Sequence, residues 1–149
     1  FIAGAATFAM GHIFYLITYC VIDKIRKIDI ILTLIIFVGI ISFLFGTPIF
    51  DFGEQIMKVI VLLYCIIICA MTAKAIMNLY RSRTKANLFF ACGSIMFFFS
   101  DVMLVLNLFA DTSNITHILC HSTYFPGQWM LSYGIFRLVD EEKERSCRR

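Results

Sequence analysis

Five long apolar runs, separated by short polar connections, make up most of this chain. The runs cover about 1–22, 30–46, 57–78, 87–110 and 116–136. A helix needs about 20 mostly apolar residues to cross a bilayer, and these runs lack the alternation that marks barrel strands. The sequence therefore predicts an all-α fold: a polytopic transmembrane helix bundle over 1–136, followed by a charged tail over 137–149.

The composition agrees with an integral membrane protein. Of the 149 residues, 60% are hydrophobic and 15% are charged, and the mean hydropathy is +0.87. Soluble domains are about 45–50% apolar and about 25% charged. The net charge of +3 is small, and no basic patch interleaved with aromatic residues is present, which excludes a nucleic-acid partner. We expect the lipid bilayer to be the main surrounding of this chain.

Basic residues occur in alternate connections only. Residues 23–29 and 81–86 each hold three Lys or Arg, and the tail from Arg137 holds five. The connections 47–55 and 111–115 hold none. Because basic loops stay on the cytoplasmic side of a membrane, we expect the two basic connections and the tail to be cytoplasmic.

Two lysines lie inside the third apolar run, near its opposite ends. Lys58 and Lys74 are separated by 16 positions, or about 24 Å along a helix. A lysine near the end of a spanning helix can extend its ammonium group to the headgroups. We predict this conformation, and no catalytic role, for both lysines.

The most expensive residue in the apolar runs is Asp101. An aspartate at the centre of a spanning helix costs about 2.5–3.5 kcal/mol on insertion scales, and such residues usually mark functional sites. Burial without a cation favours the protonated carboxylic acid, which is a possible general acid. The alternative is a structural side chain that is hydrogen-bonded to a neighbouring helix.

Other polar residues of the fourth run lie near Asp101 on the expected helix. Ser94 and Asp101 are seven residues apart and share one face, and Ser100 and Asn107 share the adjacent face. This spacing predicts a helix that lines a cavity with one broad polar side. Each of these side chains alone is more often a hydrogen-bonding contact between helices.

The first and fifth runs each carry a polar stripe with histidine. His12, Tyr15 and Tyr19 follow a helical spacing in the first run, and His12 lies near its middle. In the fifth run the stripe has four members and is interrupted by a proline and a glycine, where a kink is expected. These residues are His117, His121, Tyr124 and Gln128, with Pro126 and Gly127.

Other chemistries find little support. The chain has no GxSxG nucleophile motif, no HExxH zinc motif and no glycine-rich phosphate loop. His117 and His121, together with His12 and Asp101, make a four-ligand metal set conceivable, but an HxxxH spacing is a weak signal. We therefore expect no metal and no cofactor.

Three stretches together resemble a known family. They are FAMGHIFY (8–15), GSIMFFFSDVMLVLNLF (93–109) and YFPGQWMLSYG (124–134). They give a Gly-His-x-x-Tyr helix, then a Ser-Asp-x5-Asn helix, and then a last helix with Tyr and Gln. This order resembles the lysoplasmalogenase family of membrane proteins, also called the YhhN-like family. The matching residues are Gly11, His12, Tyr15, Ser100, Asp101, Asn107, Tyr124 and Gln128.

The resemblance implies a bundle of eight helices, of which five are visible here, and places the start of this chain just after a Gly-Asp-bearing helix. It also implies chemistry with two intramembrane aspartates, of which Asp101 is the second. The expected substrate is a lysoplasmalogen, a lysolipid whose vinyl ether bond is cleaved to a fatty aldehyde and a glycerophospho-alcohol.

The resemblance gives the polar residues separate expected roles. Asp101 is the expected catalytic acid or base, and the remaining residues are expected to position water or substrate. These positioning residues are His12, Tyr15, Ser100, Asn107, Tyr124 and Gln128. Two alternatives use the same polar cavity: a small transporter or lipid-binding protein without enzyme activity, and a metal-dependent lipid hydrolase.

Overall fold

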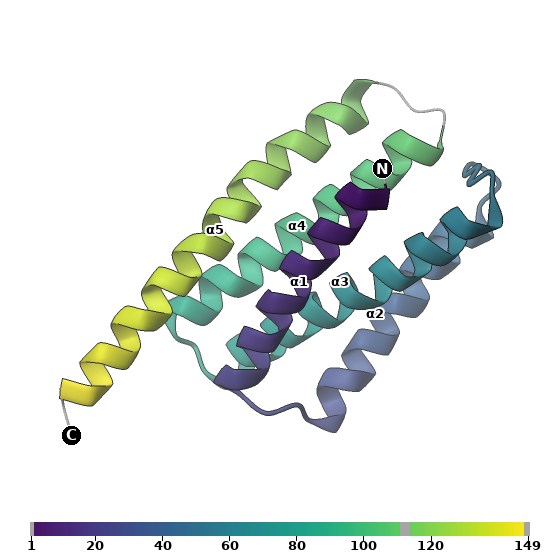
Figure 1. Ribbon diagram of the computed structural model, residues 1–149. Coiled ribbons are helices and arrows are strands. Elements are labelled where there is room, and N and C mark those ends of the chain that lie inside the picture. Colours follow the sequence, from purple (N-terminus) through teal and green to yellow (C-terminus); the bar gives the residue numbers. More distant parts are fainter. Residues whose placement is uncertain (1, 111–113, 148–149) are drawn as a thin grey trace.

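The computed structural model describes residues 2–110 and 114–147 and consists of five α-helices (Figure 1). Their bounds are α1 Ile2–Ile22, α2 Lys27–Gly46, α3 Gln55–Arg81, α4 Lys85–Phe109 and α5 Asn114–Cys147. Within the described residues the only extended pairing is an isolated bridge between Phe50 and Ala110. The prediction of an all-α fold is confirmed. Part of the expected connection 111–115, residues 111–113, lies outside the described residues.

Three of the helices are long and apolar enough to cross a membrane, namely α2, α3 and α4. The apolar part of α1, Ala6–Ile22, is shorter than these three helices. Helix α5 continues beyond the apolar run that ends near 136 and includes charged residues up to Cys147. On α2 many large aliphatic side chains are exposed, because among the described helices this one packs on α3 alone, and that surface suits contact with lipid.

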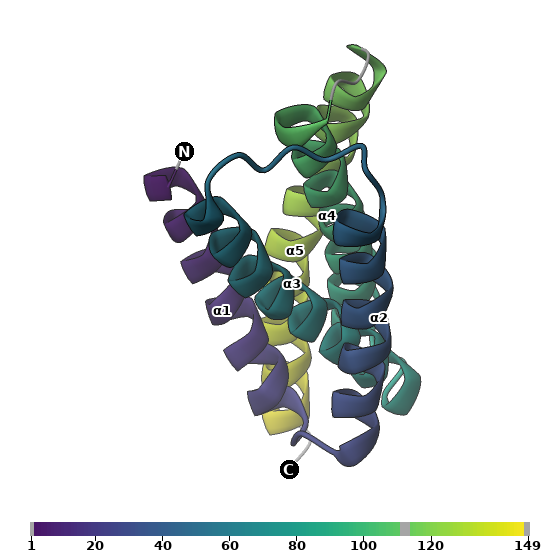
Figure 2. The same cartoon turned by 90° about the vertical axis from the view of Figure 1, so that its right-hand side faces the viewer.

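Helix α3 is the centre of the bundle. It packs against α1, α2 and α4, and α5 packs along α4. Figure 2 shows α1 and α2 on opposite sides of α3. Between α1 and α4 the contact is made by large side chains. The ring centroids of Tyr19 and Phe90 are 4.9 Å apart, and the Tyr19 hydroxyl is 3.1 Å from Ser94 Oγ. This spacing of the helices leaves room for cavities beside α1.

Small residues let α4 and α5 approach closely. A Cβ at Gly93 would lie 3.1 Å from the Gly127 carbonyl oxygen, and a Cβ at Gly127 would lie 3.3 Å from the Gly93 carbonyl oxygen. At Gly134 a Cβ would lie 2.7 Å from the ring of Phe90, which is buried. Close backbone approach at small residues is a usual source of helix association in membranes.

Substituting Gly134→Ala is therefore expected to destabilise the bundle by about 1–3 kcal/mol, the usual cost of adding a methyl group to a filled core. Thermal unfolding of the purified protein in detergent measures this loss. Gly39→Ala on α2 is the matched control, because a Cβ there meets nothing within 4 Å. Equal unfolding temperatures for the two variants would contradict the close packing of α4 on α5.

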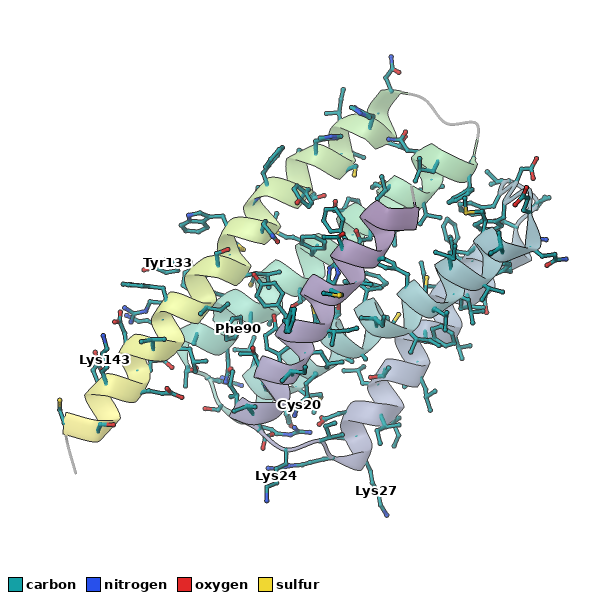
Figure 3. All side chains as sticks on the ribbon, viewed as in Figure 1. Cys20, Lys24, Lys27, Phe90, Tyr133 and Lys143 are labelled. Carbon is teal, nitrogen blue, oxygen red and sulfur yellow. The ribbon has the colours of Figure 1, made fainter. Side chains whose placement is uncertain are left out.

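The two basic connections and the end of α5 lie at the same end of the bundle (Figure 1). Lys24, Lys27 and Lys143 extend from this end in Figure 3. The alternation of charge in the sequence therefore corresponds to a separation in space.

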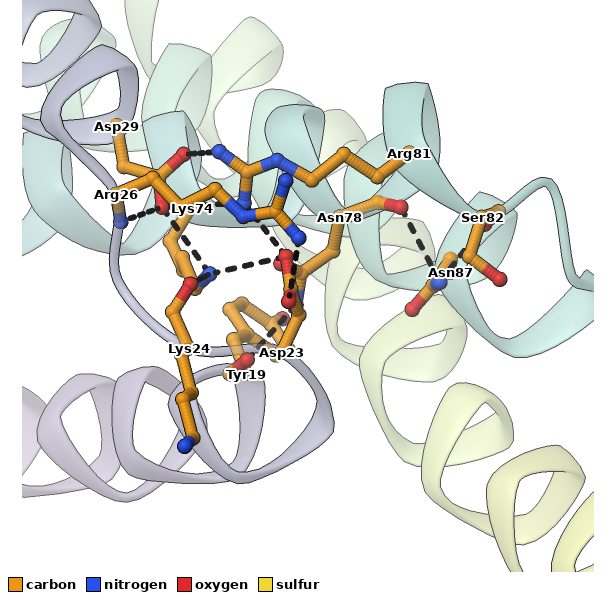
Figure 4. Close-up of polar contacts among 10 residues, drawn as sticks. All are labelled: Tyr19, Asp23, Lys24, Arg26, Asp29, Lys74, Asn78, Arg81, Ser82 and Asn87. Atoms are coloured by element: carbon orange, nitrogen blue, oxygen red, sulfur yellow. Dashed lines mark hydrogen bonds and ion pairs between the residues drawn. The ribbon is translucent and has the colours of Figure 1, made fainter.

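Figure 4 shows a cluster of charged side chains at this end. Lys74 Nζ donates to Asp29 Oδ2 at 3.2 Å and to the Lys24 carbonyl at 3.1 Å. Arg81 pairs with the same Asp29 and, at 2.7 Å, with Asp23. The prediction that Lys74 extends to the headgroups is wrong, because this side chain is 2% exposed and neutralises aspartates from the connection between α1 and α2.

Partial burial alone would raise the pKa of Asp23, but the hydrogen bond from Arg81 and the nearby charges of Lys74 and Arg26 lower it below its ordinary value. Asp23 therefore stays ionised at neutral pH and holds the connection on α3. The Asp29 carboxylate also accepts from the Arg26 backbone N–H at 2.9 Å, which caps the start of α2.

Candidate functional site

Asp101 lies inside the bundle on α4, at the point where α1, α3 and α4 meet. It is 7% exposed. Its Oδ2 accepts a hydrogen bond from the Tyr64 hydroxyl at 2.8 Å and lies 4.0 Å from His12 Nε2. An intramembrane carboxyl group is thus held by a tyrosine from α3 and faced by a histidine from α1.

The His12 side chain is held in one orientation. Its Nδ1 lies 2.7 Å from the Phe8 carbonyl, an acceptor, so this nitrogen carries the proton. The ring packs edge-on against Phe97 at 4.7 Å and against Tyr64 at 5.6 Å. In the neutral imidazole, Nε2 is then an acceptor directed toward Asp101.

Tyr64 is the residue of this site that the sequence analysis missed. It lies in an unbroken apolar stretch of α3, 37 positions before Asp101. The signal that points to it is general: a tyrosine hydroxyl in an apolar helix needs a hydrogen-bond partner when it is buried. Tyr64 acts through Asp101, so it is a positioning residue.

The Tyr64→Phe variant removes only the hydroxyl that donates to Asp101. A hydrogen bond to an ionisable group contributes about 1.5–3 kcal/mol, so we expect kcat for the hydrolysis that the family resemblance implies to fall at least roughly tenfold. The ring and its packing remain, so KM should stay near its wild-type value. Steady-state kinetics that show a raised KM with unchanged kcat would contradict this role.

An apolar pocket of about 520 Å³ opens beside Asp101. Residues of α1, α3, α4 and α5 line it, and most of them are Phe, Leu, Ile, Val or Gly. Its polar residues are Tyr64, Ser100, Asp101, His121 and Tyr124. Such a size is usual for a small-molecule site, and the lining suits a hydrocarbon chain next to a single reactive group.

A second, smaller cavity of about 200 Å³ lies on the His12 side of the site. Phe8 lines both cavities, and its ring centroid lies 6.0 Å from that of Tyr124 and 6.4 Å from that of Phe97. Tyr15 and Gln128 line this second cavity, as does His12. The two cavities therefore meet at the rings of Phe8, Phe97 and Tyr124, next to the pair formed by His12 and Asp101.

The structure thus brings together most of the residues that the sequence analysis proposed. His12 and Asp101 face each other, Ser100 and Tyr124 line the first cavity, and Tyr15 and Gln128 line the second. Ser100 also donates to the Cys120 carbonyl at 3.0 Å, which joins α4 to α5.

Asn107 lies apart from both cavities. It is near the end of α4, where its side-chain oxygen accepts from the Thr116 hydroxyl at 2.8 Å. Six residues of helix, about 9 Å, separate it from Asp101. Its observed contact joins the ends of α4 and α5.

The remaining polar residues from the sequence analysis have partners outside this site or are exposed. Ser94 is paired with Tyr19, away from Asp101. His117 and His121 are exposed, with ring centroids 4.3 Å apart, and His121 Nδ1 donates to the His117 carbonyl at 2.9 Å. Among the described residues, no group of three or more His, Cys, Asp or Glu side chains is arranged to hold a metal ion.

Apolar helices long enough to span a bilayer, with a buried carboxyl group at an apolar pocket, define a helical membrane protein with an internal site. A sequence model of the YhhN family matches residues 1–135. The chain belongs to the YhhN family, as the sequence resemblance predicted. No curated protein and no solved structure matches it.

Proposed function

We propose that this protein hydrolyses the vinyl ether bond of a lysoplasmalogen and releases a fatty aldehyde and a glycerophospho-alcohol. Its family includes lysoplasmalogenases. The observation that carries the proposal is Asp101, a buried carboxyl group at the wall of an apolar pocket. None of the described residues that line this pocket is Lys or Arg, and such an environment favours the protonated acid.

The chemistry of a vinyl ether suits such an acid. Asp101 gives its proton to the alkenyl carbon that is not bonded to oxygen, and the adjacent carbon becomes part of an oxocarbenium ion. Oδ2 accepts from Tyr64, and in this proposal the other oxygen, Oδ1, carries the proton before transfer. The resulting Asp101 carboxylate stabilises the positive charge in a site with little water.

Water then adds to the oxocarbenium ion and forms a hemiacetal. The attacking water gives one proton to His12 Nε2 or to the Asp101 carboxylate, which lie 4.0 Å apart. The hemiacetal hydroxyl then gives up its proton as the bond to the glycerol oxygen breaks, and the glycerol oxygen takes up one proton, which leaves the aldehyde. The sum is one lysoplasmalogen plus one water to one aldehyde plus one glycerophospho-alcohol.

The resemblance implied a second intramembrane aspartate as a partner of Asp101. The described residues that line the two cavities include no second carboxyl group. In this proposal the proton of water is accepted either by the Asp101 carboxylate itself or by His12, the ionisable side chain that faces it. The basic end of the bundle faces the cytoplasm in this proposal, as the positive-inside rule predicts.

Turnover by the detergent-purified protein tests the enzyme assignment. We expect aldehyde release from lysoplasmalogen without a membrane, an ion gradient or an added metal. A transporter or lipid-binding protein would bind the lysolipid and release no aldehyde. A metal-dependent hydrolase would lose its activity in the presence of a chelator.

A further inference from the structure

The smaller cavity beside His12 is a candidate site for a polar group of a ligand. It measures about 200 Å³, which is far more than the roughly 30 Å³ that one water molecule occupies in the liquid. Besides His12 and Gln128, the residues that line it are Thr7, Phe8, Gly11, Tyr15, Phe97 and Leu131. The cavity therefore has room for a polar group of several atoms.

Two acceptors beside this cavity have no hydrogen-bond partner among the described residues. They are Oε1 of Gln128 and Nε2 of His12, and both atoms are shielded from solvent. His12 Nε2 is an acceptor because Nδ1 donates to the Phe8 carbonyl. A buried acceptor without a donor is unfavourable, so a ligand that donates a hydrogen bond is favoured here.

The lining also limits the kind of donor. The described residues that line the cavity include no Lys or Arg, so a phosphate group would enter it without a cation to neutralise it. A hydroxyl group is neutral and supplies the missing donor. His12 faces Asp101 across 4.0 Å, so a ligand in this cavity lies next to the carboxyl group that borders the apolar pocket.

We propose that the smaller cavity binds the glycerol end of a single-chain lipid, and that Gln128 Oε1 accepts a hydrogen bond from the free sn-2 hydroxyl. This assignment rests on the proposed function. The alkenyl chain occupies the apolar pocket, and the vinyl ether lies between the two cavities beside Asp101. A lipid with an acyl group on the sn-2 oxygen lacks the donor and is too large for the cavity, so Gln128 selects lysolipids.

The test combines a change in the ligand with a change in the protein. The ligands are a saturated alkyl-ether lysolipid, which cannot be hydrolysed, and its 2-deoxy analogue, in which hydrogen replaces the sn-2 hydroxyl. Binding is measured on the full chain in detergent. We expect the wild type to bind the hydroxyl ligand roughly tenfold more tightly, the usual contribution of one hydrogen bond.

The Gln128→Leu variant is expected to bind both ligands equally, because it keeps the approximate size of the side chain and removes the acceptor. Gln128→Glu, which keeps an acceptor oxygen, should retain a preference for the hydroxyl ligand. Gln55→Leu at the exposed start of α3 is the matched control and should behave as the wild type.

Two results would overturn the assignment: equal binding of the two ligands by the wild type, or an unchanged preference in Gln128→Leu. The first result would mean that Gln128 holds water only. Because binding is measured without hydrolysis, these results are separate from a failure of the proposed function, which would appear as absent aldehyde release with the preference for the hydroxyl ligand intact.

Discussion

Replacing Asp101 with asparagine is expected to lower aldehyde release from lysoplasmalogen by roughly 10²–10⁴-fold, the usual contribution of a general acid. Asparagine has nearly the same shape and can still accept from the Tyr64 hydroxyl, so the fold should persist. It has no acidic proton to give to the alkenyl carbon. The measurement is aldehyde formation in membranes that contain equal amounts of the wild-type and variant proteins.

Asp140→Asn is the matched control for this experiment. Asp140 lies near the end of α5, where it is 3.7 Å from Arg137, and it lines neither of the two cavities beside Asp101. We expect its activity to equal that of the wild type. Full activity of Asp101→Asn at normal expression would show that this carboxyl group is not the acid.

The second large effect concerns stability. Asp29→Ala removes the shared partner of Lys74 and Arg81 and leaves Lys74, which is 2% exposed, without its closest carboxylate. Breaking a buried ion pair from one side costs about 3–5 kcal/mol. Thermal unfolding in detergent should show a large fall in midpoint temperature for this variant.

Adding Lys74→Met to Asp29→Ala is expected to restore part of the lost stability, because it removes the buried charge that has lost its partner. Asp140→Ala again serves as the control, since a partly exposed surface pair contributes about 0–1 kcal/mol. If Asp29→Ala were no more costly than Asp140→Ala, the charged cluster would not hold the connection between α1 and α2.

The fold class was predictable because the lengths of the apolar runs fix the type and number of elements. The observed helices begin and end within a few residues of the expected bounds, apart from α5. That helix continues to Cys147, because the charged residues after 136 include many good helix formers and no proline or glycine. Hydropathy alone marks the end of the apolar run and not the end of the helix.

Contacts between residues that are far apart in the sequence were harder to predict. Lys74 and Asp29 are 45 positions apart, and nothing in either local pattern indicates that they pair. The contact between Tyr64 and Asp101 was missed for the same reason. His12 and Asp101 were considered together because both belong to short motifs of one family, and the helix packing places them 4.0 Å apart.

Helical spacing alone also grouped residues that do not belong to one site. Ser100 and Asn107 share one face of α4, but only Ser100 reaches the apolar pocket. Asn107 instead meets Thr116 where α4 and α5 are joined. A shared helix face therefore does not by itself place two residues in one site.

Cleavage of lysoplasmalogen in deuterium oxide tests the central claim most directly. If an acid protonates the alkenyl carbon, the released aldehyde, reduced at once to its alcohol, carries one solvent deuterium on the carbon next to the former carbonyl. Mass spectrometry of that alcohol should show this single deuterium with the wild-type protein and almost no product with Asp101→Asn. An aldehyde released without deuterium would contradict the proposed mechanism.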